Sequence, residues 1–81
     1  MGQCVVQDIN IGANLKKLRR RAHMTQAEVA AKLELRGFSV SREIYAQIET
    51  GQHHIRISVL LALKEIFRAS YEEIFEIESE L

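Results

Sequence analysis

Hydrophobic residues recur along most of the chain at intervals of three or four positions, which is the spacing of one face of an α-helix. The first such stripe consists of Ile11, Leu15, Leu18 and Ala22. The positions between them form a basic outer face made of Lys16, Lys17, Arg20 and Arg21. An apolar stripe opposite a charged face is typical of an amphipathic surface helix, so this segment predicts a first helix.

The second and third helices are indicated by their ends as well as by their stripes. Thr25 and Glu28 have the spacing of a capping box, and a second helix is predicted from about residue 26 to 34. Ser41 is a candidate N-cap for a third helix, and Gly51 can end that helix in a left-handed conformation. The inward residues of the two helices are Val29, Ala30, Leu33, Tyr45 and Ile48.

Two more helices complete the pattern. Ser58 is a candidate N-cap for the fourth, and Ser70 and Glu73 form a second capping box that opens the fifth. The apolar positions of these helices are Leu60, Leu61, Leu63, Ile66, Phe67, Ile74 and Phe75. No stripe is long enough for a coiled coil, so we predict a compact all-α domain of five short helices.

Composition limits what such a chain can be. With 81 residues, of which 47% are hydrophobic, and no proline, it can bury one small core. We expect an N-terminal arm over residues 1–10, one domain over 11–76 and an acidic tail over 77–81. No run approaches the roughly 18 to 20 apolar residues of a membrane span, and no signal peptide is evident. A single cysteine, Cys4, suits a reducing compartment, so we expect a cytoplasmic protein with no membrane partner.

The charge is unevenly distributed although its formal sum is zero. Residues 1–70 hold all eleven Lys and Arg against six acids, a charge of +5, and the other five acids lie in the last eleven residues. A basic body with an acidic end is compatible with a nucleic-acid partner.

The segments LKKLRRRAHMTQAEVAAKL and VSREIYAQIETG, followed by a leucine-rich helix, carry a resemblance to a known family. From about Ile11 to Phe75 the chain resembles the Cro and phage-repressor (XRE-type) DNA-binding family. The resemblance implies a lambda-repressor-like fold that contains a helix-turn-helix. It also implies sequence-specific binding to operator DNA, with the third helix, about residues 42–50, in the major groove.

The chain departs from the family pattern between the two helices of this motif. Typical members turn in about four residues, whereas this chain uses residues 34–40. We interpret Glu34 and Leu35 as an extension of the second helix and Gly37 as a residue with positive φ. Phe38 and Val40 are expected to fix the enlarged corner against the core.

The resemblance places the DNA contacts on particular residues. Gln26, in the first turn of the second helix, is expected to donate to a phosphate. On the third helix, Arg42 can pair with guanine, Gln47 with adenine and Glu43 with cytosine. Ala46 or Ile44 could meet a thymine methyl group. The other candidates are the Ser41 cap and the loop residues Gln52, His53, His54 and Arg56, which could face the DNA backbone.

Family positions also imply a partly buried ion pair between Arg19 and Glu49. We expect a homodimer, because one recognition helix reads few base pairs. Its candidate surface is the C-terminal helix with Tyr71, Ile74, Phe75 and Ile77, although these residues could instead close the core.

Other functions have less support from the residues. Adjacent histidines without a nearby cysteine do not form a metal site, and no nucleophile is placed beside the acids, so we expect no enzyme, cofactor or small-molecule ligand. The alternative to a DNA-binding regulator is a protein-interaction module of the same fold, antitoxin-like or accessory. Such a module would use a surface around Ile44 and Tyr45.

Overall fold

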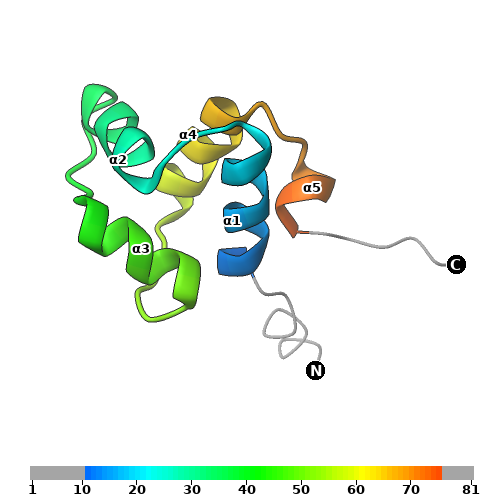
Figure 1. Ribbon diagram of the computed structural model, residues 1–81, viewed down its shortest axis with the longest axis horizontal. Coiled ribbons are helices and arrows are strands. Elements are labelled where there is room, and N and C mark those ends of the chain that lie inside the picture. The colour runs from blue at the N-terminus through cyan, green and yellow to red at the C-terminus, as the bar shows by residue number, and fades with distance from the viewer. Residues whose placement is uncertain (1–10, 76–81) are drawn as a thin grey trace, which may run out of the picture.

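The computed structural model describes residues 11–75 (Figure 1). The arm predicted for residues 1–10 and the tail predicted for 77–81 lie outside this range. Five helices and no strand occur among the described residues, which confirms the all-α prediction. The helices are α1 (Ile11–Arg21), α2 (Gln26–Leu35), α3 (Arg42–Thr50), α4 (Ile57–Phe67) and α5 (Tyr71–Phe75).

Side-chain caps define the ends of three helices, as the sequence predicted. At α2 the N–H of Glu28 donates to Thr25 Oγ1 at 3.1 Å and the N–H of Thr25 donates to Glu28 Oε1 at 2.8 Å. The same reciprocal pair joins Ser70 and Glu73 at α5, at 3.1 and 2.9 Å. Ser41 caps α3 through the N–H of Ile44 at 3.1 Å. These local bonds satisfy N–H groups that have no acceptor inside the helix.

The start of α4 differs from the prediction. The helix begins at Ile57 with Arg56 as its N-cap, and no side chain caps it. Ser58 therefore lies inside the first turn, from which its hydroxyl cannot take the N-cap role. Leu61 was also assigned to the inward stripe, but its side chain is 43% exposed because it points away from the face that carries Leu60 and Leu63.

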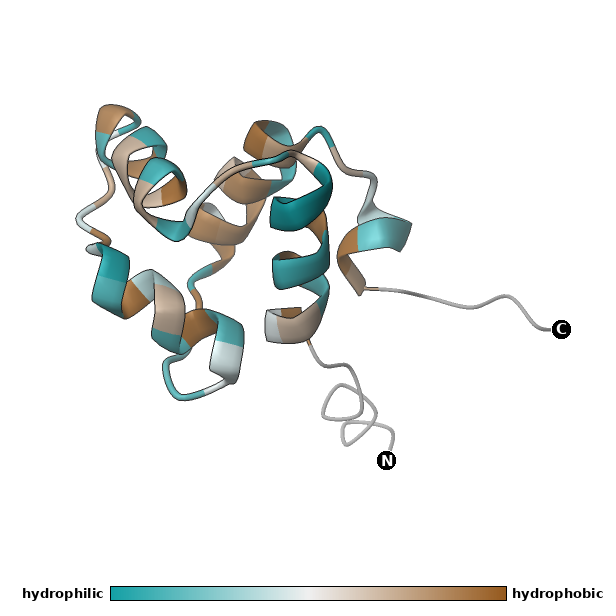
Figure 2. Ribbon diagram, viewed as in Figure 1, coloured by the Kyte–Doolittle hydropathy of each residue, from teal (hydrophilic) through white to brown (hydrophobic). Residues whose placement is uncertain are grey.

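Residues from all five helices form the core. Its largest fully buried side chains are Leu15, Val29, Leu33, Tyr45, Leu63 and Ile74. In Figure 2 most of α4 is coloured hydrophobic, whereas the turns of α1 that carry Lys and Arg are hydrophilic. One hydrogen bond, from Asn14 Nδ2 to the carbonyl oxygen of Ile74 at 2.9 Å, ties α5 to α1 within this apolar interior.

The N-terminal end of α1 touches the C-terminal end of α3. A Cβ atom at Gly12 would lie 2.5 Å from the carbonyl oxygens of both Ile48 and Glu49, so a glycine is required for this approach. In Figure 1, α1 lies between α3 on one side and α5 on the other. This contact sets the position of α3 relative to the rest of the domain.

The enlarged corner has the predicted form. Gly37 has a φ of 92°, and the N–H of Phe38 donates to the carbonyl oxygen of Leu33 at 3.0 Å, which reverses the chain after α2. Phe38 and Val40 are half-buried and pack against the core. Leu35 is helical as expected, but its side chain is 87% exposed.

Candidate nucleic-acid interface

Helix α3 has one buried face and one solvated face. Tyr45, Ile48 and Glu49 are buried, because they point toward α1, α2 and the core. On the other side Arg42, Glu43 and Gln47 are exposed, and Ala46 is half-exposed. These four are sequence-predicted contacts, and the helix brings them together on one polar surface.

Ile44 does not belong to this polar surface. The sequence placed it among the groove-facing residues, but its side chain is half-buried and packs against the core. It shares the apolar side of α3 with Tyr45 and Ile48, one and four residues along, so Ala46 is the small apolar residue left on the polar side.

The first turn of α3 carries two opposite charges. Arg42 Nη2 lies 3.6 Å from Glu43 Oε2, and the two side chains are 53% and 72% exposed. A pair of this kind contributes little in water. Both groups can therefore turn toward a partner. Ser41, immediately before them, has its hydroxyl oxygen engaged in the cap of the helix.

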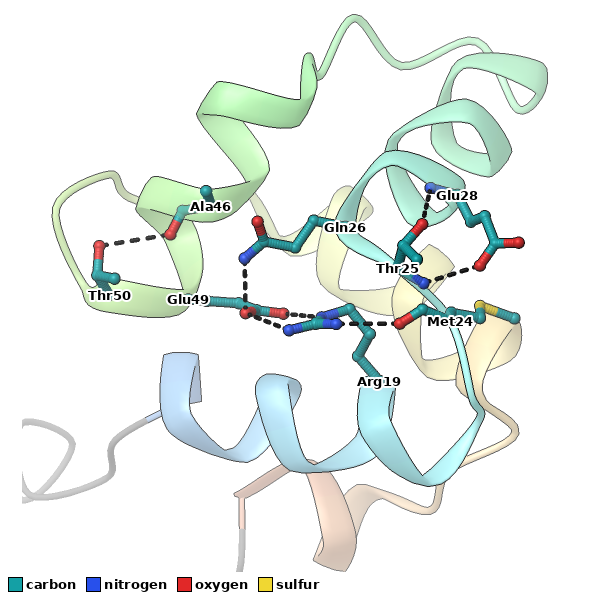
Figure 3. A network of polar contacts seen from close by, with 8 residues as sticks. All are labelled: Arg19, Met24, Thr25, Gln26, Glu28, Ala46, Glu49 and Thr50. Atoms are coloured by element: carbon teal, nitrogen blue, oxygen red, sulfur yellow. Dashed lines mark hydrogen bonds and ion pairs between the residues drawn. The ribbon is translucent and has the colours of Figure 1, made fainter.

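The ion pair predicted between Arg19 and Glu49 is present (Figure 3). Arg19 Nε donates to Glu49 Oε2 at 2.7 Å and Arg19 Nη2 donates to Glu49 Oε1 at 3.2 Å. The side chains are 12% and 2% exposed, respectively. A third bond from Arg19, to the carbonyl oxygen of Met24 at 3.0 Å, holds the segment that leads into α2.

Gln26 joins this ion pair from the start of α2. Its Nε2 donates to Glu49 Oε1 at 3.0 Å, so one carboxylate connects α1, α2 and α3. The sequence had assigned Gln26 to a phosphate and did not foresee this contact. The amide carries a second N–H group, which leaves a donor for a ligand.

Burial and hydrogen bonding act in opposite directions on this carboxylate. Burial by itself raises the pKa of Glu49, but the hydrogen bonds from Arg19 and Gln26 outweigh it and lower the pKa below its usual value. The bond to Glu49 raises the pKa of Arg19. The pair is therefore fully ionised at neutral pH.

Tyr45 is buried beside these groups, and its hydroxyl has no hydrogen-bond partner. Burial raises the pKa of this phenol well above its usual value, so the hydroxyl stays neutral.

The loop after α3 presents the other predicted contacts. Gln52, His53 and Arg56 are exposed, and His53 Nδ1 lies 2.9 Å from the carbonyl oxygen of the neighbouring His54. Together with Phe38, Val40 and Ile55, this loop surrounds a hollow of about 520 Å³ beside the corner.

Helix α1 adds basic residues that were not among the predicted DNA contacts. Lys16 and Arg20 are exposed on its outer face. Arg21, on the other hand, pairs with Glu73 at 2.5 Å. The dense run of Lys and Arg in residues 16–21 was the sequence signal that could have indicated Lys16 and Arg20 as DNA contacts.

The part of the chain that the structure describes has neither a candidate membrane span nor a candidate metal site. No helix within residues 11–75 is long and apolar enough to cross a membrane. No three His, Cys, Asp or Glu side chains in this range gather where they could hold a metal ion.

Two short helices joined by a corner, the second with its polar face turned outward, are the geometry of a helix-turn-helix. The model of a family described as "Helix-turn-helix domain" matches residues 10–75. The chain belongs to the helix-turn-helix domain family. No curated protein and no solved structure matched it. In this helix-turn-helix domain, α2 is the first helix of the motif and α3 the second. Since helix-turn-helix units bind DNA through the second helix, the family indicates DNA binding and a regulatory role.

Proposed function

We propose that this protein is a sequence-specific transcriptional regulator of the repressor type that acts in the cytoplasm and inserts α3 into the major groove of operator DNA. The observation that carries the proposal is that α3 has one buried face and one exposed face. Its apolar side is buried, while Arg42, Glu43 and Gln47 stand exposed on the opposite side. A solvated helix face rich in hydrogen-bonding groups matches what base edges in the major groove require.

The polar residues of α3 have complementary roles in this proposal. Arg42, next to the cap, can donate two bonds to guanine, and Gln47 lies about one and a half turns further along and can pair with adenine. Glu43 can accept from cytosine, and the methyl group of Ala46 can contact thymine.

Contacts to the DNA backbone come from the surroundings of α3. The N–H groups of Gln26 and Ala27 have no acceptor within α2, and the side-chain amide of Gln26 keeps one N–H that Glu49 does not use. Further donors are available on the exposed residues Lys16, Arg20, Gln52, His53 and Arg56. Such contacts orient the domain without carrying base information.

The proposal includes a homodimer, but the surface nominated from the sequence needs correction. Ile74 is 1% exposed and closes the core, so it cannot face a second copy. Ile77 lies outside the described residues. On α5, Tyr71 keeps 56% of its surface exposed, with Lys64 Nζ 4.5 Å from the centre of its ring. The α4 residues Ile57 and Leu61 are a better source of apolar contact area, at 71% and 43% exposed.

A protein-interaction module is the second candidate function. The surface first considered for it, around Ile44 and Tyr45, does not exist, because Tyr45 is fully buried and Ile44 packs against the core. The observation that favours an interaction role is instead the exposure of Leu35, at 87%. Apolar side chains this exposed mark partner surfaces when they occur in patches.

Selection of bound sequences from a random duplex DNA pool tests the proposed function. We expect one preferred site with two half-sites about 34 Å apart, and an affinity that falls steeply with salt as counterions are released. Recovery of no preferred sequence, together with undetectable binding at low salt, would favour the interaction module.

A further inference from the structure

The carboxylate of Glu49 holds the side chain that begins α2. Its Oε1 accepts from both Arg19 Nη2 at 3.2 Å and Gln26 Nε2 at 3.0 Å, and its Oε2 accepts from Arg19 Nε at 2.7 Å. Glu49 itself is almost completely enclosed, with 2% of its side chain exposed. Glu49 can therefore influence DNA bound at the proposed interface only through the side chains that it contacts.

The bond to Glu49 decides which way the amide of Gln26 faces. An ionised carboxylate can only accept hydrogen bonds, so the amide must turn its nitrogen inward. The reverse orientation would bring the amide oxygen against a carboxylate oxygen, with repulsion in place of a bond. Figure 3 shows the result, with Nε2 directed at Glu49 and the amide oxygen directed away from it.

Arg19 fixes the other side of the same arrangement. It keeps Glu49 ionised, and through its bond to the carbonyl oxygen of Met24 it also holds the segment just before α2. The start of α2 is thus held at two points, Met24 and Gln26. Met24 is held by Arg19 of α1, and Gln26 is held by Glu49 of α3.

We propose that Glu49 is a positioning residue for DNA recognition, which touches no DNA but sets the direction in which Gln26 presents its free N–H and its carbonyl oxygen. This inference rests on the proposed function, because it explains how Gln26, one of the proposed DNA contacts, is oriented. Loss of Glu49 then weakens DNA binding through Gln26, in addition to any loss of stability.

A double-mutant cycle on DNA affinity separates positioning from stability. The four proteins are the wild type, Glu49→Gln, Gln26→Met and the double variant. They are titrated into a duplex oligonucleotide carrying the site selected from the random pool, at a temperature where circular dichroism shows all four folded. Glu49→Gln keeps the shape of the side chain but removes its charge, so the Gln26 amide can take either orientation. Glu65→Gln, on the exposed face of α4, is the control with the same change in charge.

The expected result is coupling between the two sites. Glu49→Gln should weaken binding about fivefold when Gln26 is present and less than about twofold in the Gln26→Met background. Glu65→Gln should behave alike in both backgrounds. Equal losses from Glu49→Gln in both backgrounds would overturn the positioning role while leaving the proposed function intact. Absence of binding to any DNA by the wild type would overturn both.

A measurement on the wild type alone keeps the inference testable if Glu49→Gln does not fold. The side-chain amide of Gln26 gives two proton resonances in a ¹⁵N correlation spectrum. A bond to the carboxylate should move one of them downfield and make its exchange with water slow. Two resonances at the positions of a solvated glutamine would show that the amide is not held, and the inference would be wrong.

Discussion

Replacement of Glu49 by alanine tests how much the buried ion pair contributes to folding. The Arg19 side chain is only 12% exposed, so the change leaves its guanidinium in a largely buried site without the carboxylate. The hydrogen bond from Arg19 to the carbonyl oxygen of Met24 is retained. The change also leaves Gln26 without its acceptor. Removal of one partner from a buried pair costs about 3 to 5 kcal/mol, whereas an exposed pair contributes under about 1 kcal/mol.

The structure favours the lower end of the range for a buried pair. Arg19 retains some contact with water and its bond to Met24, so its charge is not left wholly unsolvated. We expect a loss of about 3 kcal/mol. A domain of this length has a total stability of about 4 to 12 kcal/mol, so the variant should remain folded in the cold but unfold at a clearly lower temperature.

Urea unfolding of two variants provides the measurement. Glu65→Ala is the matched control, because Arg36 Nη1 lies 2.7 Å from Glu65 Oε1, the same distance as the shortest contact of the buried pair, but the two side chains are 42% and 68% exposed. Glu65→Ala should therefore cost under about 1 kcal/mol. If both variants lose the same small amount, burial does not strengthen the pair and the reasoning is refuted.

Four further predictions follow from single residues. The folded-state pKa of Glu49 is lowered from 4.5, so the contribution of Glu49 to folding stability is complete above pH 4.5 and is lost as the pH falls below it. The melting temperature of the wild type should therefore drop more steeply in acid than that of Glu49→Gln. Gly12→Ala should destabilise the domain by about 1 to 3 kcal/mol in urea unfolding, because the new methyl group meets two backbone oxygens of α3. Tyr45→Phe should be neutral or stabilising by up to about 1 kcal/mol in the same assay, since it removes a buried hydroxyl without a partner; a large loss would show that the hydroxyl is bonded after all. Gln47→Ala should weaken the selected site by about 1 to 3 kcal/mol and relax preference at one base pair, whereas Gln26→Ala should weaken all sequences alike, as titrations of single-base variants would reveal.

The helices and most of their ends were accessible from the sequence because the signals are local. Thr25 and Glu28 are three residues apart, as are Ser70 and Glu73, and each pair closes its box within one turn. Gly37 and Gly51 adopt positive φ for the same local reason, since each follows the last turn of a helix. Ser58 was misplaced because a serine inside the first turn produces the same sequence signal as a true cap.

The side of a helix on which a residue lies was harder to predict. Leu60 and Leu61 are equally hydrophobic, and only the direction of the core decides that the first is buried and the second is 43% exposed. Ile44 was misassigned for a similar reason, and for Ile74 the sequence left two roles open, a dimer surface or closure of the core. Each looked available to a partner until the position of the neighbouring helices showed that the core uses it.

The chain alone thus determined five helices, most of their caps and the corner, since each depends on residues within a turn or two of one another. The pairing of Arg19 with Glu49, thirty residues apart, was implied by resemblance to a family and by no pattern within the chain. The bond between Gln26 and Glu49 had no sequence signal at all. It exists because the close approach of α1 to α3 at Gly12, and the direction in which the corner returns the chain, bring three helix surfaces to one carboxylate. Such a meeting depends on how helices pack, which short-range propensities do not specify.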